Sequence, residues 1–417
     1  MEVVVARCAG LDVHQKTVMA CVRVPGENGE RTQTVRQFRT FTAGLRALRQ
    51  WLLEQGVTQV AMEATGVYWR PVWHVLEDAP GLELLLANAQ HVKNVPGRKT
   101  DVSDAAWLAQ LLECGLLRGS FVPPPVIAQL RDLTRYRKKL VEDRTREVQR
   151  VQKVLEDAGI KLSSVASDTL GVSGRAMLDA LIDGVVAPEL LAEMAKGKLR
   201  AKLEELELAM EGRFGDHHRA LLREHLAHID YLSATVDRLD GQVAALLAPF
   251  GKQVEHLITI PGVGQRTAEV IIAEIGVDMS RFPTAGHLAS WAGMCPGNHE
   301  SAGKRKSGRT RHGNSALRSA LVEAAWAASR SKGTYLSAQF WRLQRRFGKR
   351  QQNKALLAVG HSILVIAWHL LKNDTDYSDL GADYFDHRQD TALLQKRLVQ
   401  RLEELGNTVT VTPRPAA

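Results

Sequence analysis

The chain has 417 residues, too many for one ordinary hydrophobic core, so we expect two or three domains. Its 45% apolar and 24% charged residues are typical of a soluble globular protein, and they exclude long disorder, collagen-like sequence and a membrane protein. The net charge is +9, and residues 251–417 hold 23 basic and 14 acidic side chains. Residues 299–354 alone hold 14 basic and 2 acidic ones, which indicates a phosphate-rich partner.

The first part of the chain alternates short β-branched runs with helical periodicity. Strands are expected at 3–9, 17–24, 34–41, 59–63 and 82–87, and helices at 42–55, 68–77 and 102–112. Adjacent strands followed by strands that alternate with helices predict an α/β domain with a mixed sheet. The segment Phe121-Val-Pro-Pro-Pro125 cannot continue a helix and marks a linker.

The rest of the chain is predicted to be helical. Residues 127–158 carry one long apolar stripe, and residues 189–247 are expected to form a stalk that returns toward it and offers a dimer surface. The apolar run 355–371 contains two histidines and fits a buried helix better than a membrane span, so no membrane is expected. The predicted divisions are 1–122, 123–250, 251–372 with mainly α structure, and 373–417 as a tail that contains a short helix at 391–405.

Four cysteines without metal-like spacing predict reduced thiols in a cytoplasmic protein.

Four acidic residues are candidates for one metal site. Asp12 and Glu63 stand at the ends of predicted strands, before small residues, where a side chain points into the crevice outside the sheet. Asp101 and Asp104 are spaced i, i+3 at the start of a helix and therefore share a face. Converging carboxylates repel one another without a cation, and a pair of Mg²⁺ (or Mn²⁺) ions can clamp the oxygens of a phosphodiester. Taken singly, each acid is more simply a turn or capping residue.

Glycines and basic side chains are candidates for nucleic-acid contact. The segment Leu257-Ile-Thr-Ile-Pro-Gly-Val-Gly264 has the form of a helix-hairpin-helix, in which Gly262 and Gly264 would present backbone N–H groups to a phosphate. A plain glycine turn between packed helices is the alternative. The helix 127–158 carries Arg135, Lys138 and Lys139 among many basic residues, and a solvated coiled-coil face is about as good an explanation.

A basic, glycine-rich loop holds a candidate nucleophile. Ser301 lies among five cations, namely Lys304, Arg305, Lys306, Arg309 and Arg311. Such surroundings stabilise an alkoxide and the charge that grows on phosphorus during nucleophilic attack. Ser307 is an equal candidate on chemistry alone. The segment Gly10-Leu-Asp-Val also resembles the first phosphate loop of actin-like and sugar-kinase ATPases, but that loop requires a glycine where His14 stands.

Motifs in a fixed order along the chain resemble the insertion-sequence transposases of the IS110 family, especially its IS1111 subgroup. The resemblance runs from residue 9 to about 371. It rests on Gly10-Leu-Asp-Val-His14, Met62-Glu-Ala-Thr-Gly66, Lys99-Thr-Asp-Val-Ser-Asp104, Ser173-Gly-Arg-Ala-Met177, Ile260-Pro-Gly-Val-Gly264, Trp291-Ala-Gly293, Pro296-Gly-Asn298, Glu300-Ser-Ala-Gly-Lys304, Gly313-Asn314 and Glu323-Ala-Ala325.

The resemblance implies a RuvC/RNase H-like domain with an acidic DEDD tetrad and a C-terminal serine transposase domain. Its tetrad falls on Asp12, Glu63, Asp101 and Asp104, and its nucleophile falls on Ser301. It further implies a covalent serine–DNA intermediate, a structured non-coding guide RNA that pairs with donor and target DNA, and a dimer or tetramer in the bacterial cytoplasm near the nucleoid. A RuvC-like junction nuclease that uses water and a non-catalytic nucleic-acid-binding protein remain the alternatives.

Overall fold

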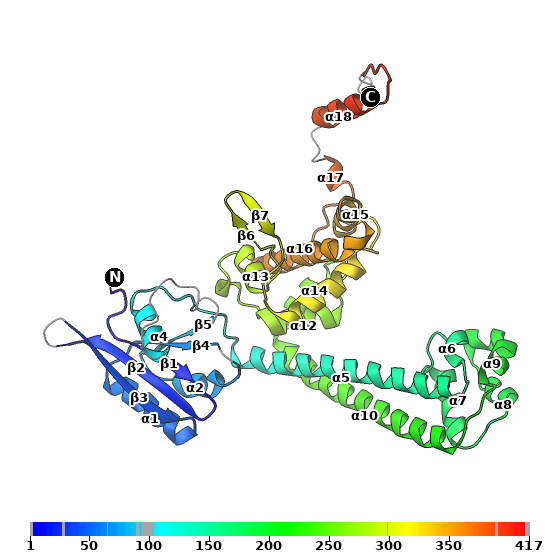
Figure 1. Ribbon diagram of the computed structural model, residues 1–417, viewed down its shortest axis with the longest axis horizontal. Coiled ribbons are helices and arrows are strands. Elements are labelled where there is room, and N and C mark those ends of the chain that lie inside the picture. Colours follow the sequence, from blue (N-terminus) through cyan, green and yellow to red (C-terminus); the bar gives the residue numbers. More distant parts are fainter. Residues whose placement is uncertain are drawn as a thin grey trace. The chain divides into compact units, whose positions relative to one another are not determined.

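The computed structural model describes residues 3–26, 30–64, 66–88, 92, 104–297, 299–387 and 391–412 (Figure 1). The chain forms two compact units, Met1–Val122 and Pro123–Ala417, and each is described by itself. The predicted finer division of the second unit at 250 and 372 stays a prediction.

The first unit is built on a mixed five-stranded sheet. Its strands are β1 (Cys8–Val13), β2 (Thr17–Pro25), β3 (Arg31–Arg39), β4 (Gln59–Glu63) and β5 (Glu83–Ala87). The order in the sheet is β3-β2-β1-β4-β5, with β1, β2 and β3 antiparallel and with β4 parallel to both β1 and β5. This confirms the predicted α/β domain with a mixed sheet, and the order is consistent with an RNase H-like fold.

Helices cover both faces of this sheet. One face packs against α1 (Thr42–Glu54) and α2 (Trp69–Leu76) through a core of alternate strand residues and helix residues such as Leu48, Leu52 and Leu76. The other face packs against α4 (Asp104–Glu113). The contact with α4 is very close, because a Cβ on Gly10 of β1 would lie 2.2 Å from the carbonyl oxygen of Ala105. Only glycine lets this helix lie directly on the first strand.

The first strand begins later than the sequence predicts. Residues 3–7 of the expected strand do not pair; the backbone N–H groups of Val4 and Val5 donate instead to the carbonyl oxygen of Glu113 at the end of α4. Pairing with β2 starts at Cys8 and continues to Val13, so Asp12 lies inside the strand and not after it. The tight β1–β2 connection extends the ladder beyond the residues that apolar periodicity marks.

A long helical hairpin opens the second unit. Helix α5 (Pro125–Asp157) and helix α10 (Asp216–Leu247) pack along one another through residues such as Leu140, Leu232 and Val236 (Figure 1). At about 1.5 Å per residue, the 33 residues of α5 span roughly 50 Å. The predicted helix at 127–158 is therefore confirmed, and its apolar stripe is covered by α10 of the same chain.

A small helical bundle connects the two long helices. It contains α6 (Leu162–Val165), α7 (Val172–Ile182), α8 (Pro188–Ala192) and α9 (Leu203–Met210), which share a core with the ends of α5 and α10. The predicted stalk at 189–247 is thus wrong in its first part, because only residues from Asp216 onward form the long helix. Non-helical residues at 193–196 and 211–215 interrupt the earlier part. Apolar side chains there, such as Leu191 and Leu206, pack in the core shared with α6 and α7 instead.

The remaining elements form a mainly helical body. They are α11 (Gly251–Ile258), α12 (Gln265–Ile275), α13 (Ala285–Trp291), the hairpin β6 (His299–Ser301) and β7 (Lys304–Ser307), α14 (Ser315–Ala328), α15 (Tyr335–Phe347), α16 (Gln352–Asn373), α17 (Tyr384–His387) and α18 (Thr391–Glu404). Residues 349–373 are long and apolar enough to cross a membrane, but 56% of the most apolar window is buried. Helix α16 packs against α11, α13, α14 and α15, so the predicted core helix is confirmed.

Candidate functional site

Two of the predicted acidic residues lie side by side at the sheet edge. Strands β1 and β4 are parallel with Leu11 beside Met62, so Asp12 and Glu63 come next on their strands at the same carboxyl edge. Side chains alternate along a strand, and Gly10 and Ala61 both face α4. Asp12 and Glu63 therefore share the face that α4 covers. Asp12 is 27% exposed and its Oδ2 lies 3.1 Å from Nε2 of His14.

A third acid comes to the same place from α4. The helix runs against β1 with Ala105 and Ala109 over Gly10 and with the carbonyl oxygen of Ala109 accepting from the Sγ of Cys8. Its first residue, Asp104, is exposed and lies toward the Asp12 end of the strand. Asp101 lies outside the described residues. The three described carboxylates are not mutually within 4.8 Å, the spacing found in groups poised to share one ion.

The predicted serine loop is a two-stranded hairpin. Ser301 of β6 pairs with Lys304 of β7 across the two-residue turn Ala302-Gly303, whose φ angles of 51° and 72° are both positive. Turns of this kind match the twist of a hairpin, but they hold an L-residue such as Ala302 in a left-handed conformation at some energetic cost. Ser301 and Lys304 are exposed at the tip.

The two candidate serines differ in their surroundings. The hydroxyl of Ser307 accepts a hydrogen bond of 3.2 Å from the backbone N–H of Arg309, at the end of β7. Within the described part of the chain, no group hydrogen-bonds the hydroxyl of Ser301. Arg309 and Arg311 are exposed beyond the hairpin, whereas the side chains of Arg305 and Lys306 lie outside the described residues.

The base of the hairpin is tightly packed. A Cβ on Gly313 would lie 2.4 Å from the backbone of Ala292, and Gly293 has a φ of 67°. The guanidinium of Arg318 donates to the carbonyl oxygens of Gly293 (2.6 Å) and Arg311 (2.8 Å). These contacts explain why the Trp291-Ala-Gly293 and Gly313-Asn314 motifs contain glycine. They also fix the position of the base of the hairpin.

The two glycines of the predicted helix-hairpin-helix have different environments. Gly262 has a φ of 87°, and a Cβ there would lie 2.3 Å from the carbonyl oxygen of Ala324 in α14. Gly264 is the N-cap residue of α12, and a Cβ there would meet nothing within 4 Å. Gly262 therefore serves packing of the turn on α14, whereas Gly264 leaves the start of α12 open.

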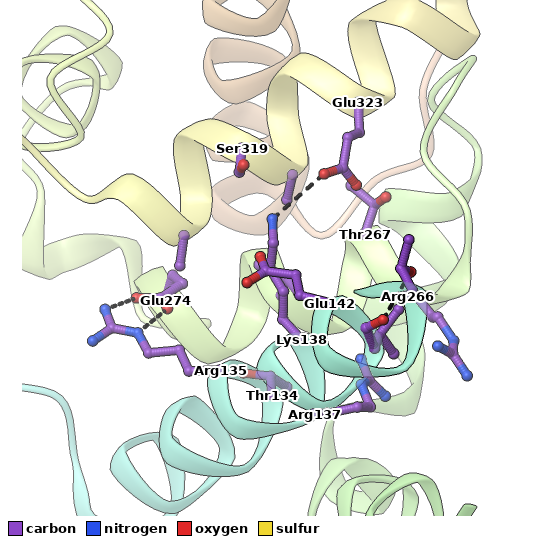
Figure 2. A pocket seen from close by; sticks show the side chains of 15 residues that line it. Thr134, Arg135, Arg137, Lys138, Glu142, Arg266, Thr267, Glu274, Ser319 and Glu323 are labelled. Atoms are coloured by element: carbon purple, nitrogen blue, oxygen red, sulfur yellow. Dashed lines mark hydrogen bonds and ion pairs between the residues drawn. The ribbon is translucent and has the colours of Figure 1, made fainter. Parts of the chain in front are cut away.

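The predicted basic contacts of α5 are paired with acids. Arg135 makes a bidentate pair with Glu274, with N–O distances of 2.7 and 2.8 Å, and the Glu274 side chain is fully buried. Lys138 lies 3.4 Å from Glu323, and Lys139 lies 3.1 Å from Glu142. Figure 2 shows Arg135, Lys138 and their partners Glu274 and Glu323 around a cavity of about 410 Å³ between α5, α12 and α14, with both contacts drawn as dashed lines.

One cluster among the described residues has metal-like spacing, namely Asp157, His217 and His218. The backbone N–H of Gly215 donates to Nδ1 of His218 over 3.1 Å, so the proton of a neutral ring sits on Nε2. That nitrogen lies 2.9 Å from Oδ2 of Asp157. The ring is thus already used to fasten the start of α10 to the end of α5, and it offers a metal no free lone pair.

Two sequence families match separate parts of this architecture. Residues 9–160 match a family described as a transposase with a DEDD domain, and residues 254–342 match the family described as the IS116/IS110/IS902 transposases. Together they span more than half of the chain.

Individual relatives agree with these matches. The chain is 26% identical over 322 residues to the transposase for insertion sequence element IS1111A of Coxiella burnetii, covering 76% of this chain and 79% of that protein. It is 26% identical over 326 residues to the putative transposase y4pF/y4sB of Sinorhizobium fredii, covering 77% and 74%. It is 30% identical over 161 residues to the pilin gene-inverting protein of Moraxella bovis, covering 36% and 47%.

An acidic sheet edge followed by a helical body with an exposed basic hairpin defines the protein, with these matches, as a transposase, an enzyme that acts on DNA. Both family matches point to the same group. The chain belongs to the IS110 family of insertion-sequence transposases and is a distant relative of the IS1111A enzyme.

No sequence motif marks the cations of α15 and of the following 3-10 turn η4 (Lys349–Gln351) as candidates for nucleic-acid contact. Five exposed Lys and Arg side chains lie there, at Arg342, Arg345, Arg346, Lys349 and Arg350. None of them forms an ion pair within the described ranges. The signal was present in the sequence as the excess of basic over acidic residues in 299–354.

Proposed function

We propose that this transposase cuts and rejoins DNA with Ser301 as the nucleophile and with an acidic pocket of Asp12, Glu63, Asp101 and Asp104 as its second half. The observation that carries the proposal is the placement of an uncommitted serine at the exposed tip of a hairpin rich in cations. A hydroxyl with no hydrogen-bond partner among the described groups can approach a phosphate without first losing a contact.

The proposed chemistry at the hairpin consists of two successive transesterifications. The Ser301 oxygen attacks the phosphorus, its proton leaves, a serine–phosphorus bond forms, and the bond to one deoxyribose oxygen breaks. A freed DNA hydroxyl then attacks the phosphoserine, forms a new phosphodiester and returns the serine. Lys304 faces Ser301 across the turn and places positive charge where the phosphorus gains negative charge.

The donor set at the sheet edge suits a hard divalent cation in its chemistry, and the three described carboxylates would draw closer together around one. Asp12 and Glu63 share one face and one edge, Asp104 comes from the helix on that face, and carboxylate oxygens are the ligands that Mg²⁺ or Mn²⁺ prefers. A bound ion would supply charge neutralisation for the oxygens of a phosphodiester. The N-terminus of α4 adds a favourable dipole for these anions. These residues would orient and hold the ion.

Two substitutions test the proposal. Ser301→Ala should abolish joining and a trappable protein–DNA adduct while leaving DNA binding close to normal, with Ser307→Ala as the matched control that retains both. Asp12→Asn should abolish strand cleavage without loss of binding. Cleavage that persists in Ser301→Ala would favour a RuvC-like nuclease that uses water. A parent protein that binds DNA without cutting it would leave only a binding role.

The proposal extends to partners. We infer from the family resemblance that donor and target DNA are chosen through a structured non-coding guide RNA. The exposed cations would then contact backbone phosphates while base pairing supplies the sequence choice. We also infer a homo-oligomer, a dimer or tetramer, that joins the two halves of the site in cis or in trans, in the bacterial cytoplasm near the nucleoid. Copurification of one RNA species and the mass of the assembly in solution test these inferences.

A further inference from the structure

Two tryptophans stand out by their exposure. Of the eight in the chain, Trp326 of α14 and Trp341 of α15 are exposed, at 41% and 51%, while the other six are buried or half-buried. An exposed indole leaves a large apolar area in contact with water, which is energetically unfavourable. Two such rings within one short stretch of chain point to a partner that covers them.

Contacts with buried groups fix the positions of the two indole rings. Both rings contact the buried ring of Phe340, with centroid distances of 6.1 Å from Trp326 and 5.2 Å from Trp341. Nε1 of Trp341 donates to the carbonyl oxygen of Ser329 over 3.1 Å, and Ser329 itself is buried. The polar group of this ring is therefore satisfied internally, and its orientation is fixed before any ligand binds.

Each tryptophan is followed by an arginine four residues later in the sequence. Trp326 is followed by Arg330, whose guanidinium lies 5.2 Å over the indole ring, and Trp341 is followed by Arg345, whose Nε donates to the carbonyl oxygen of Trp341 over 3.4 Å. Residues four apart share a face of a helix, so Trp341 and Arg345 stand together on α15. Arg330 lies in the turn after α14 and is placed beside Trp326 by its contact with the ring. Both arginines are exposed.

We propose that this Trp–Arg surface, made of Trp326, Arg330, Trp341 and Arg345, binds an unpaired strand of DNA. Flat aromatic side chains stack on bases of any sequence, and neighbouring cations neutralise the phosphates between them. The charge is complementary, since the stretch 299–354 holds 14 basic and 2 acidic side chains. Helix α14 is the next element after the serine hairpin, so a strand released by cutting there would be captured on the same body. In this last respect the inference rests on the proposed function.

The test measures binding of a labelled oligothymidylate to the full-length protein by fluorescence anisotropy at fixed salt. Loss of one stacked base should weaken binding about tenfold in Trp341→Ala, with a similar loss in Trp326→Ala. Trp341→Phe keeps a flat ring and should retain most of the affinity. Tyr231→Ala is the matched control, because Tyr231 is a 62% exposed aromatic on α10 outside this surface. Thermal unfolding of each variant separates lost binding from lost folding.

Duplex DNA and single-stranded RNA serve as comparison ligands. Binding of blunt duplex should change little in Trp341→Ala, since paired bases cannot stack on the indole. The proposal is overturned if Trp341→Ala and Trp326→Ala bind oligothymidylate as tightly as Tyr231→Ala does, or if they lose affinity for RNA alone. Ser301→Ala should bind the strand normally, so a failed joining assay and a failed binding assay report on different inferences.

Discussion

Helix α5 and the stretch formed by α15 and η4 are similarly rich in arginine and lysine, but they use these residues in opposite ways. Seven cations of α5 face carboxylates, namely Arg131, Arg135, Arg137, Lys138, Lys139, Arg146 and Arg150. The five cations of α15 and η4 form no ion pair in the part of the chain that the structure describes. Basic composition alone therefore does not identify a surface for phosphate; the presence or absence of internal acids does.

The difference is physical and not only one of counting. A paired cation must give up its carboxylate before it can contact a phosphate, and a buried carboxylate left behind is costly. An exposed cation without a partner exchanges only water and counterions, which makes binding to DNA favourable and salt-dependent. We therefore expect α5 to determine stability and α15 to determine affinity.

The largest effect should come from removing the acid that holds α5. Glu274→Ala leaves Arg131 and Arg135 without their shared buried partner, so the free energy of unfolding should fall by about 3–5 kcal/mol. Glu142→Ala breaks a surface pair with Lys139 and should leave stability close to that of the parent protein. Urea denaturation followed by circular dichroism measures both. Equal, small effects would show that the α5 pairs are not structural.

The next largest effect should come from the two glycines of the turn before α12. Gly262 is packed against α14, whereas Gly264 faces open space. Gly262→Ala puts a methyl group 2.3 Å from the Ala324 carbonyl at a φ of 87°, so overpacking should cost about 1–3 kcal/mol. Gly264→Ser has open space and a good N-cap residue, so its stability should hardly change. Normal stability in Gly262→Ala would contradict the close packing on α14.

A smaller effect should appear in DNA binding. The double variant Arg345→Gln/Arg346→Gln should weaken affinity for DNA and reduce the slope of log K against log salt by about 1 for each lost phosphate contact. Lys138→Gln, which removes a cation paired with Glu323, should leave the slope unchanged. Titrations at several salt concentrations give both slopes. The reverse result would restore α5 as the nucleic-acid-contacting helix.

The smallest effect concerns an ion pair that depends on pH. His256 of α11 contacts Asp376 through Nδ1 at 2.6 Å and Asp374 through Nε2 at 3.1 Å. The hydrogen bond to Asp376 is the main cause that raises the pKa of His256 above its ordinary value, burial opposes it, and Asp374 adds to the rise. Both ring nitrogens can donate only when the ring is charged.

The sign of the pH dependence follows from the raised pKa. The His256 contribution is complete below the ordinary histidine pKa and is lost as the pH rises through the raised value. The amide of Tyr377, which donates to Thr259 in this segment, should therefore exchange hydrogen faster as the pH rises, beyond the intrinsic effect of base. His256→Gln should remove that excess. An excess that persists in the variant would assign the pH dependence to another group.

Much of the fold could be predicted from the sequence because local patterns dominate it. The order of strands and helices in the first unit, the helix at 127–158 and the core helix around 355–371 all follow from periodicity and from Pro and Gly. The start of β1 at Cys8 and the break of the stalk before Asp216 could not be predicted this way. Both depend on pairing or packing with residues distant in the chain.

The candidate site, like the fold, could be predicted from the sequence only in part. Motif order selected Asp12, Glu63, Asp104 and Ser301, and the structure shows that Asp12 and Glu63 share one edge and face. What the sequence could not reveal was which cations already have partners, because Arg135 and Glu274 are 139 residues apart. For the same reason, the exposure of Trp326 and Trp341 became visible only with the helices that surround them.

The Glu274 carboxylate has one more consequence. It pairs with Arg135 of α5 and accepts a hydrogen bond of 2.5 Å from the side-chain amide of Asn314. The Asn314 side chain also caps the start of α14. Through this one acid, α5 is connected to the N-cap residue of α14, the helix that follows the Ser301 hairpin. Under the proposed function, a neighbouring subunit bound along α5 would be linked by Glu274 and Asn314 to the start of α14.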